Sequence, residues 1–293
     1  MIVTRCPGSC GELIQGIIFG GEKLISYPIN CYSYVKISEG KRDNELLYSK
    51  AYKAIENVFN YFKEDIDFSK KLKIEINSDI PIGKGMASST ADLGATILAT
   101  SKYLGKNISD EEIAKICTKI EPTDSTVFSD ITLFDHLKAS YFKRYGRNFK
   151  YKVLILEGKY VIDTINFRKI DKSHILDGNI SNVRKALKDI EIGIENNDIK
   201  KVGEGAILSA LANEDILKKP GLEIIIERAL KFGAYGLNIA HSGSVIGIIF
   251  EDKYFDKEVF IENIKKEDFM NDYINIREYE TVNCGVEIVN MEG

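Results

Sequence analysis

The stretch PIGKGMASST (81–90) joins two segments whose apolar residues follow different periods. Residues 72–77 alternate between apolar and polar side chains, which predicts a strand. The Ala- and Leu-rich run 89–104 predicts a helix. Gly83 and Gly85 can take backbone angles that are closed to other residues, and they leave room for a ligand beside the main chain. The chain must therefore make a tight strand-to-helix turn here.

Such a turn fits two purposes. The unpaired amide groups and the dipole at the start of the helix would attract a phosphate, to which Lys84 could add charge. The hydroxyl groups of Ser88 and Ser89 could bind the phosphate or Mg²⁺. Alternatively, the turn only connects two elements, and one of these serines caps the helix. The stretch matches neither G-x-x-x-x-G-K-[ST] nor G-x-G-x-x-G, so the glycines alone favour an ordinary turn.

Periodicity and capping signals predict a mixed α+β chain. Ser109 and Glu112 have the spacing of a capping box, which predicts a helix at 110–120. A new strand follows the first group of helices near 145–155, which predicts a domain boundary there. The predicted domains are 1–150 and 151–293; further strands are expected at 29–37, 151–157 and 244–250, and further helices at 46–62, 179–196, 198–212 and 221–232.

The composition argues against several classes of partner. A formal net charge of −4 and a pI of about 5.6 give no basic excess for nucleic acid or an anionic membrane surface. The chain lacks the ~20-residue apolar run of a membrane span, and its first residues lack the features of a signal peptide. Five scattered cysteines favour reduced thiols and a cytoplasmic location over a disulfide framework.

Four segments resemble those of one enzyme family. PIGKGMASST follows the pattern P-x-G-x-G-[LM]-[GAS]-S-S-[AST] of the galactokinase, homoserine kinase, mevalonate kinase and phosphomevalonate kinase superfamily, the GHMP kinases. RCPGSCGELIQG (5–16), EPTDSTVFSD (121–130) and GAYGLNIAHSGSVIGIIF (233–250) resemble further superfamily segments in the expected order. Ser9 stands where common members have lysine, and the wording CPGSCGEL-x-QG looks like the branch that phosphorylates L-threonine.

The resemblance implies a two-domain GHMP kinase fold. Its N-terminal domain would be similar to domain 2 of ribosomal protein S5, and its C-terminal domain would be ferredoxin-like. The implied reaction is phosphorylation of the side-chain hydroxyl of L-threonine by ATP and Mg²⁺, and O-phospho-L-threonine would serve the aminopropanol linker of cobalamin. The alternatives are a kinase for homoserine or another small hydroxy acid, and a catalytically silent regulator that binds a metabolite.

The resemblance also assigns roles to residues. Asp124 would orient the acceptor hydroxyl or take its proton, unless it only shapes a turn. Ser89 and Glu121 would bind Mg²⁺, although Glu121 could equally be a solvated residue at a helix end. The nucleotide would bind to Pro81, Ile82, Gly83, Lys84, Gly85, Met86, Ala87, Ser88 and Ser89.

An amino-acid substrate needs partners for both of its charged groups. By charge type, Glu12 or Asp124 could bind the ammonium, and Arg5 or Arg144 could bind the carboxylate. His241 lies inside the last of the four segments, and we expect it to orient a loop rather than to transfer a proton.

Overall fold

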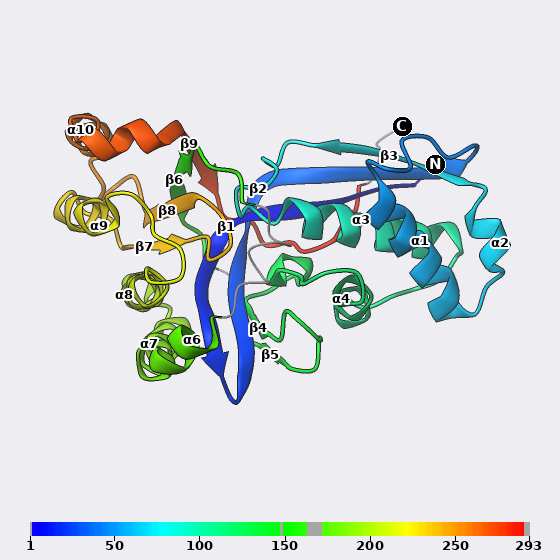
Figure 1. Cartoon of the computed structure of the whole chain (residues 1–293), viewed down its shortest axis with the longest axis horizontal. Coiled ribbons are helices and arrows are strands. Elements are labelled where there is room, and N and C mark those ends of the chain that lie inside the picture. Colours follow the sequence, from blue (N-terminus) through cyan, green and yellow to red (C-terminus); the bar gives the residue numbers. More distant parts are fainter. Residues whose placement is uncertain (1, 147–148, 163–171, 290–293) are drawn as a thin grey trace.

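A long hairpin connects the two halves of the molecule (Figure 1). The computed structural model describes residues 2–146, 149–162 and 172–289. Strands β1 (Ile2–Ile18) and β2 (Gly21–Glu39) are 17 and 19 residues long. Phe19 and Gly20 turn the chain between them with φ of 49° and 76°. Two consecutive residues with positive φ are typical of the type I′ turn, whose twist matches that of antiparallel strands.

The N-terminal half packs helices against this hairpin. β3 (Leu72–Ser78) pairs with β2, and α3 (Ser88–Tyr103) contacts both β1 and β2. Most of α3 is buried, because small side chains let it fit between the sheet and the outer helices. The outer helices are α1 (Ser49–Phe62), α2 (Ile66–Ser69) and α4 (Asp110–Thr118), and short elements follow as η1 (Ser125–Val127), β4 (Thr132–Phe134) and β5 (Phe142–Arg144).

The C-terminal half contains four antiparallel strands in the order β7-β8-β6-β9. Along the chain, helices lie between β6 and β7 and between β8 and β9. The order β-α-β-β-α-β is that of a ferredoxin-like domain. Its elements are β6 (Lys152–Gly158), α6 (Ser173–Gly178), α7 (Ile180–Asn196), α8 (Ile199–Ala212), α9 (Leu222–Lys231), β7 (Gly236–Ile239), β8 (Val245–Phe250), α10 (Lys257–Ile264), η2 (Asp268–Asp272) and β9 (Tyr273–Glu280).

Burial on both faces explains the apolar run of β6. Val153 and Ile155 belong to the core that includes the hairpin, whereas Leu154 and Leu156 belong to a core shared with α9 and α10. A strand covered on both sides needs apolar residues throughout rather than in alternation.

One continuous sheet joins the halves. Glu12 of β1 pairs with Ile239 of β7, and β10 (Glu287–Ile288) returns from the C-terminal half to pair with β1. The boundary between residues 150 and 151 stays a prediction, and residues 147–148 beside it lie outside the described residues.

Apart from the strand predicted at 29–37, the predicted elements agree with the structure to within three residues at either end. The capping box of Ser109 and Glu112 is confirmed, and the strand predicted at 29–37 is part of β2. The other predictions correspond to α1, β3, α3, β6, α7, α8, α9 and β8. The sequence analysis missed β1, because bulges between Pro7 and Ile14 break its alternation and both of its faces are buried there. The F-G-G turn signal at residues 19–21 could have located the hairpin.

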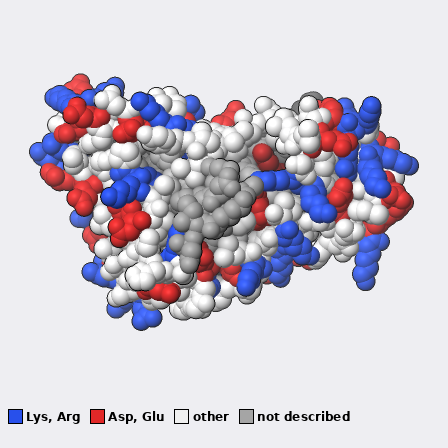
Figure 2. Space-filling model, viewed as in Figure 1, with Lys and Arg blue, Asp and Glu red and all other residues white. Residues whose placement is uncertain are grey.

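The surface carries charges of both signs. Lysine and arginine are interspersed with aspartate and glutamate across the face seen in Figure 2. All five cysteines are free, and in the part of the chain that the structure describes no helix is long and apolar enough to cross a membrane.

Close contact between α8 and β7 depends on two glycines. A Cβ on Gly203 would lie 2.4 Å from the carbonyl oxygen of Tyr235, and one on Gly236 would lie 2.3 Å from the Cα of Gly203. We expect Gly203→Ala to lower the free energy of unfolding by about 2–3 kcal/mol, because backbone cannot move aside as a flexible side chain can. Gly178→Ala is the control, since a Cβ there meets nothing within 4 Å, and it should be neutral or stabilising by less than about 1 kcal/mol. Urea unfolding of both variants measures the difference, and equal stabilities would contradict the prediction.

Candidate active site

Backbone hydrogen bonds bring three of the segments together. Gly11 of β1 donates its N–H to the carbonyl of Gly85 (3.1 Å), and Ser9 donates to that of Met86 (3.0 Å). Ser244, which precedes β8, donates to the carbonyl of Lys84 (2.9 Å). The glycine loop is therefore held between the start of the chain and the loop that connects β7 and β8.

The approach is so close that only glycine fits at two of the meeting points. A Cβ on Gly85 would lie 2.3 Å from the Cβ of Ala240, and one on Gly243 would lie 2.3 Å from the carbonyl oxygen of Lys84. Gly85 also has a φ of 83°, which disfavours any side chain. The three segments thus form one site by direct main-chain contact.

The start of α3 has no side-chain cap. Ala87 occupies the N-cap position with a left-handed backbone (φ 60°), and the helix begins at Ser88. Ser88 and Ser89 therefore lie in the first turn and are not the N-cap. An uncapped N-terminus leaves amide groups available to an anion.

Lys84 is turned away from this amide cluster. Its Nζ donates to the carbonyls of Gly158 (2.7 Å) and Lys159 (3.2 Å) and lies 3.8 Å from Glu157 Oε1. Both side chains of the ion pair are buried. In this structure the lysine charge stabilises the contact between the glycine loop and the end of β6, and a contribution to phosphate binding stays a prediction.

The two predicted metal ligands are in contact. Ser89 donates a hydrogen bond to Glu121 Oε1, and Lys50 forms an ion pair with Oε2 (2.6 Å). Among the described residues, no group of three or more His, Cys, Asp or Glu side chains could hold a metal ion. Mg²⁺ prefers hard oxygen ligands and takes only one or two from the protein when phosphates supply others, so a hydroxyl and a carboxylate fit it.

Asp124 is tied to both α3 and β2. Its N–H donates to Thr90 Oγ1 (3.0 Å), and its carboxylate accepts from Thr90 Oγ1 at Oδ2 (3.3 Å) and from Ser26 Oγ at Oδ1 (3.2 Å). Thr90 directly follows the glycine-loop serines, so these contacts place the carboxylate beside the first turn of α3.

Glu12 and His241 form a buried pair. Glu12 Oε2 accepts from the main-chain N–H of His241 (2.9 Å) and lies 3.0 Å from its Nδ1. The other ring nitrogen, Nε2, lies 3.3 Å from Ser209 Oγ in α8. His241 thereby connects its loop to β1 and α8, which agrees with an orienting role without testing it.

The two arginines considered for a substrate carboxylate have other partners. Arg5 forms an ion pair with Glu287 (2.6 Å) and lies over the ring of Tyr32. Arg144 forms ion pairs with Asp110 (3.2 Å) and Asp130 (2.6 Å). Neither contacts Glu12 or Asp124 within the described ranges.

Two ionisable residues near the site were missed in the sequence analysis. Asp92 of α3 accepts a hydrogen bond from Ser33, and burial, with a further contribution from the charge of Glu121, raises its pKa to about 6. Lys219, in the loop after α8, is buried, which lowers its pKa to about 8 against the opposing charges of Glu214 and Glu12. Neither lies in a recognisable motif, so only the tertiary structure identifies them.

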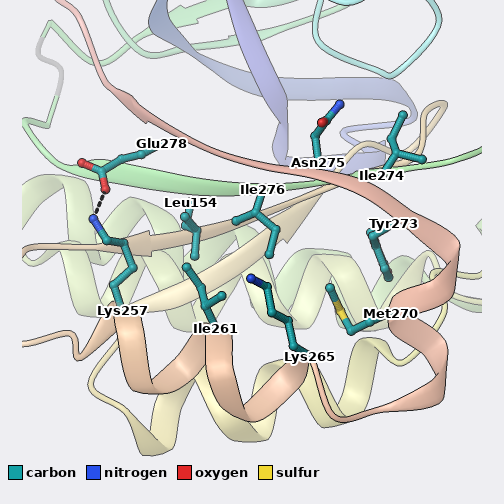
Figure 3. A pocket seen from close by; sticks show the side chains of 10 residues that line it. All are labelled: Leu154, Lys257, Ile261, Lys265, Met270, Tyr273, Ile274, Asn275, Ile276 and Glu278. Carbon is teal, nitrogen blue, oxygen red and sulfur yellow. Dashed lines mark hydrogen bonds and ion pairs between the residues drawn. The ribbon is translucent and has the colours of Figure 1, made fainter.

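A hollow of about 620 Å³ lies elsewhere, between α10 and β9 (Figure 3). Apolar side chains such as Leu154 and Ile276 form part of its wall, and Lys257 pairs with Glu278 beside it (2.5 Å). None of the residues that line it belongs to the four segments described above.

Two family models that match the chain, together with its curated relatives, identify a small-molecule kinase. The GHMP kinases N terminal domain matches residues 49–134, and the GHMP kinases C terminal domain matches residues 184–259. The chain belongs to the GHMP kinases, which confirms the predicted two-domain fold and implies ATP as a substrate.

Individual relatives cover most of the chain. An L-threonine kinase of Salmonella typhimurium is 36% identical over 255 residues, which are 87% of this chain and 84% of the relative. A homoserine kinase of Caldanaerobacter subterraneus is 26% identical over 267 residues, or 84% of this chain and 82% of the relative. The crystal structure of a homoserine kinase from Cytophaga hutchinsonii superimposes with a TM-score of 0.72 at 13% identity, covering 98% of this chain and 97% of that one, and shows a shared fold.

The raised pKa of Asp92 makes stability depend on pH. The usual value in an unfolded chain is 3.8, so the folded protein holds this proton more tightly, and the stability gained is full below pH 4 and lost as pH rises through about 6. Asp92→Asn can still accept from Ser33 but does not ionise. Between pH 4 and pH 7 its free energy of unfolding should therefore rise relative to the wild type by about 2 kcal/mol.

Urea unfolding at the two pH values measures this double difference. The matched control is Asp177→Asn, because Asp177 is exposed and its substitution should leave the pH profile unchanged. Parallel profiles for the wild type and Asp92→Asn would contradict the prediction.

Proposed function

We propose that the protein transfers the γ-phosphoryl group of ATP to the side-chain hydroxyl of L-threonine. The observation that supports this most is the 36% identity to an L-threonine kinase over 87% of the chain. The main-chain junction of the glycine loop with the first and last segments supports it independently, because a kinase must hold phosphates and acceptor in one place. The sequence of the first segment, residues 5–16, further implies that O-phospho-L-threonine serves the cobalamin linker.

The five free cysteines favour a reducing, cytoplasmic setting for this reaction.

In this proposal each part of the site has one task. The main-chain N–H groups of residues 82–89 bind the phosphates, beside Pro81, which has no N–H, and the uncapped start of α3 adds its dipole. Asp124 orients the acceptor hydroxyl and accepts its proton. Ser89 and Glu121 hold Mg²⁺, which neutralises charge on the phosphates when it is bound.

A homoserine kinase is the second candidate within the family. The 26% identity to such an enzyme over most of the chain favours it, and the two amino acids differ only in where the hydroxyl lies. A silent regulator would bind nucleotide without turnover, so an activity measurement separates all three.

ADP release with ATP and Mg²⁺ tests the acceptor and the role of Asp124. We expect L-threonine to be preferred over L-serine, L-homoserine and mevalonate. Asp124→Asn should lower kcat by about 10²–10⁴-fold, because the amide can orient a hydroxyl but cannot take its proton. A preference for homoserine would replace the proposed substrate, and nucleotide binding without turnover on any acceptor would favour the regulator. Asp177→Asn should match the wild type.

The proposed metal site predicts a changed requirement for Mg²⁺. Glu121→Gln removes a charged ligand, so the free Mg²⁺ concentration that gives half-maximal rate should rise about tenfold or more. Glu45→Gln removes an exposed carboxylate and should have no effect. If both variants need the same Mg²⁺ concentration as the wild type, Glu121 is not a ligand.

A further inference from the structure

The Glu12–His241 pair extends into a chain of buried polar groups. Glu12, His241 and Ser209 are 5%, 3% and 1% exposed. Because an ionised carboxylate only accepts, Nδ1 of His241 is the donor to Glu12, and Nε2 faces the hydroxyl of Ser209. Ser209 Oγ in turn accepts from the main-chain N–H of Gln15 (3.3 Å). This series of hydrogen bonds begins at Glu12 and ends at Gln15, both on β1, so it holds the Glu12 carboxylate in one orientation.

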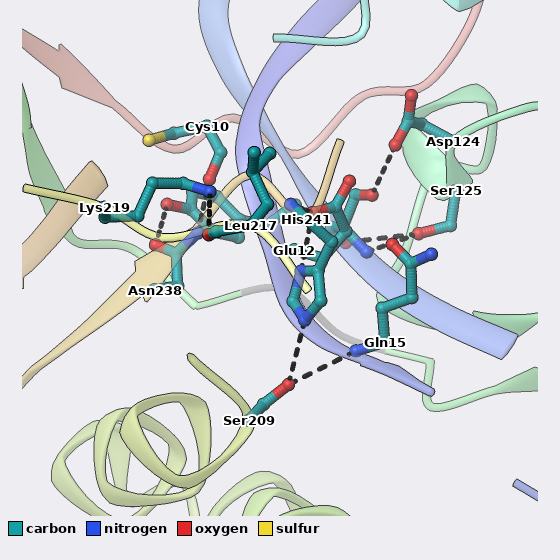
Figure 4. Close-up of polar contacts among 12 residues, drawn as sticks. Cys10, Glu12, Gln15, Asp124, Ser125, Ser209, Leu217, Lys219, Asn238 and His241 are labelled. Carbon is teal, nitrogen blue, oxygen red and sulfur yellow. Dashed lines mark hydrogen bonds and ion pairs between the residues drawn. The ribbon is translucent and has the colours of Figure 1, made fainter. Parts of the chain in front are cut away.

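The main chain at Glu12 connects to the glycine loop on one side and, through Ser26, to Asp124 on the other. The residue before it, Gly11, donates to the carbonyl of Gly85 in the loop. Across the hairpin, Glu12 pairs with Ser26, whose hydroxyl donates to Asp124 (3.2 Å). Figure 4 shows Glu12 in the middle of this group, with Asp124 to one side and Lys219 to the other. The position is next to where an acceptor hydroxyl must lie if Asp124 orients it.

Glu12 lacks a strong cationic partner in the described structure. Both hydrogen bonds from His241 fall on Oε2, and Oε1 makes no hydrogen bond or ion pair with any described residue. Lys219 is electrostatically coupled to Glu12, but its Nζ donates to the carbonyl of Leu217 (3.1 Å). A carboxylate removed from water is costly unless a charged donor satisfies it, so a ligand cation would stabilise this one.

Asp124 is the less suitable partner for such a cation. Both of its oxygens already accept hydrogen bonds from the hydroxyls of Ser26 and Thr90. Each carboxylate oxygen has two lone-pair positions for donors, and among the described residues Oε1 of Glu12 uses neither of them. The two carboxylates therefore suit different groups of one small substrate.

We infer that Glu12 binds the α-ammonium of an amino-acid substrate, and that His241 and Ser209 position its carboxylate. The inference rests on the proposed function only in taking an amino acid as the acceptor. It assigns recognition of the amino acid to Glu12 and orientation of the hydroxyl to Asp124, and it explains why an acceptor without an ammonium group would be rejected.

Paired substrates test this directly. (R)-3-Hydroxybutyrate is L-threonine with the ammonium replaced by hydrogen, so it cannot use Glu12. For Glu12→Gln we expect KM for L-threonine to rise about 10- to 100-fold with kcat changed less than about threefold, while kcat/KM for (R)-3-hydroxybutyrate stays within about threefold of the wild type. An equal loss on both substrates would show a structural role and overturn the inference, as would an unchanged KM for L-threonine.

A binding measurement does not depend on turnover. L-2-Aminobutyrate keeps the ammonium and lacks the hydroxyl, and its affinity, measured by calorimetry, should fall about 10- to 100-fold in Glu12→Gln. The affinity for ATP should not change, which also shows that the variant is folded. Glu22→Gln, on the same hairpin, is the matched control and should bind as the wild type does. Unchanged affinity of Glu12→Gln for L-2-aminobutyrate would overturn the inference.

The positioning residues have a graded expectation. Ser209→Ala should raise KM for L-threonine about two- to fivefold without lowering kcat, because it removes the hydroxyl that contacts Nε2 of His241. His241→Asn keeps an N–H donor near the position of Nδ1 and should be milder than His241→Ala. Equal defects in the two histidine variants, or a loss of kcat in place of a rise in KM, would contradict their positioning role.

The same design separates the inference from the proposed function. If the wild type prefers L-homoserine, the proposed substrate fails, and L-homoserine paired with 4-hydroxybutyrate repeats the test of Glu12. If the preferred acceptor is mevalonate, which has no ammonium group, the inference itself is overturned.

Discussion

The contact on which the site depends is the main-chain junction around residues 84–86. Ser9, Gly11 and Ser244 donate to three consecutive carbonyls of the glycine loop, and they come from the two halves of the molecule. These bonds fix the conformation of the loop. Because Gly85 and Gly243 leave no room for a Cβ, the junction tolerates little change. A loop that is held in this way loses little conformational entropy if a ligand binds to it.

Buried charged residues also reinforce the junction. Lys84, with Glu157 and the carbonyls at the end of β6, attaches the loop to the C-terminal half. Glu12 and His241 attach β1 to the loop that leads into β8. Both contacts lie out of water, where a charge that no donor satisfies is costly, so each favours one arrangement of the two halves. The orientation of the glycine loop and that of the neighbouring carboxylates thus have a common origin.

Local signals predicted the elements that depend on local chemistry. The capping box at Ser109, the glycine loop and the periodic helices all follow from residues near one another in the sequence, and the structure agrees with them. Contacts between distant residues were not predictable in this way. The position of Lys84 in the loop predicts a phosphate ligand. In the structure its ammonium group donates to the carbonyls of Gly158 and Lys159, more than 70 positions away. Glu12 and His241 are 229 positions apart, and Asp92 shows its raised pKa only where α3 is buried against β2.

Composition and spacing within short segments were enough to indicate the class of fold, the family resemblance and the residues of the glycine loop. Which of the charged residues come into contact follows only from the folded structure. In the fold, Asp124 accepts hydrogen bonds from Ser26 and Thr90, Ser89 donates one to Glu121, and Glu12 accepts one from His241. The reason is physical: burial and pairing of charges depend on the distance between side chains in space, and a bulged hairpin shared by both halves sets those distances.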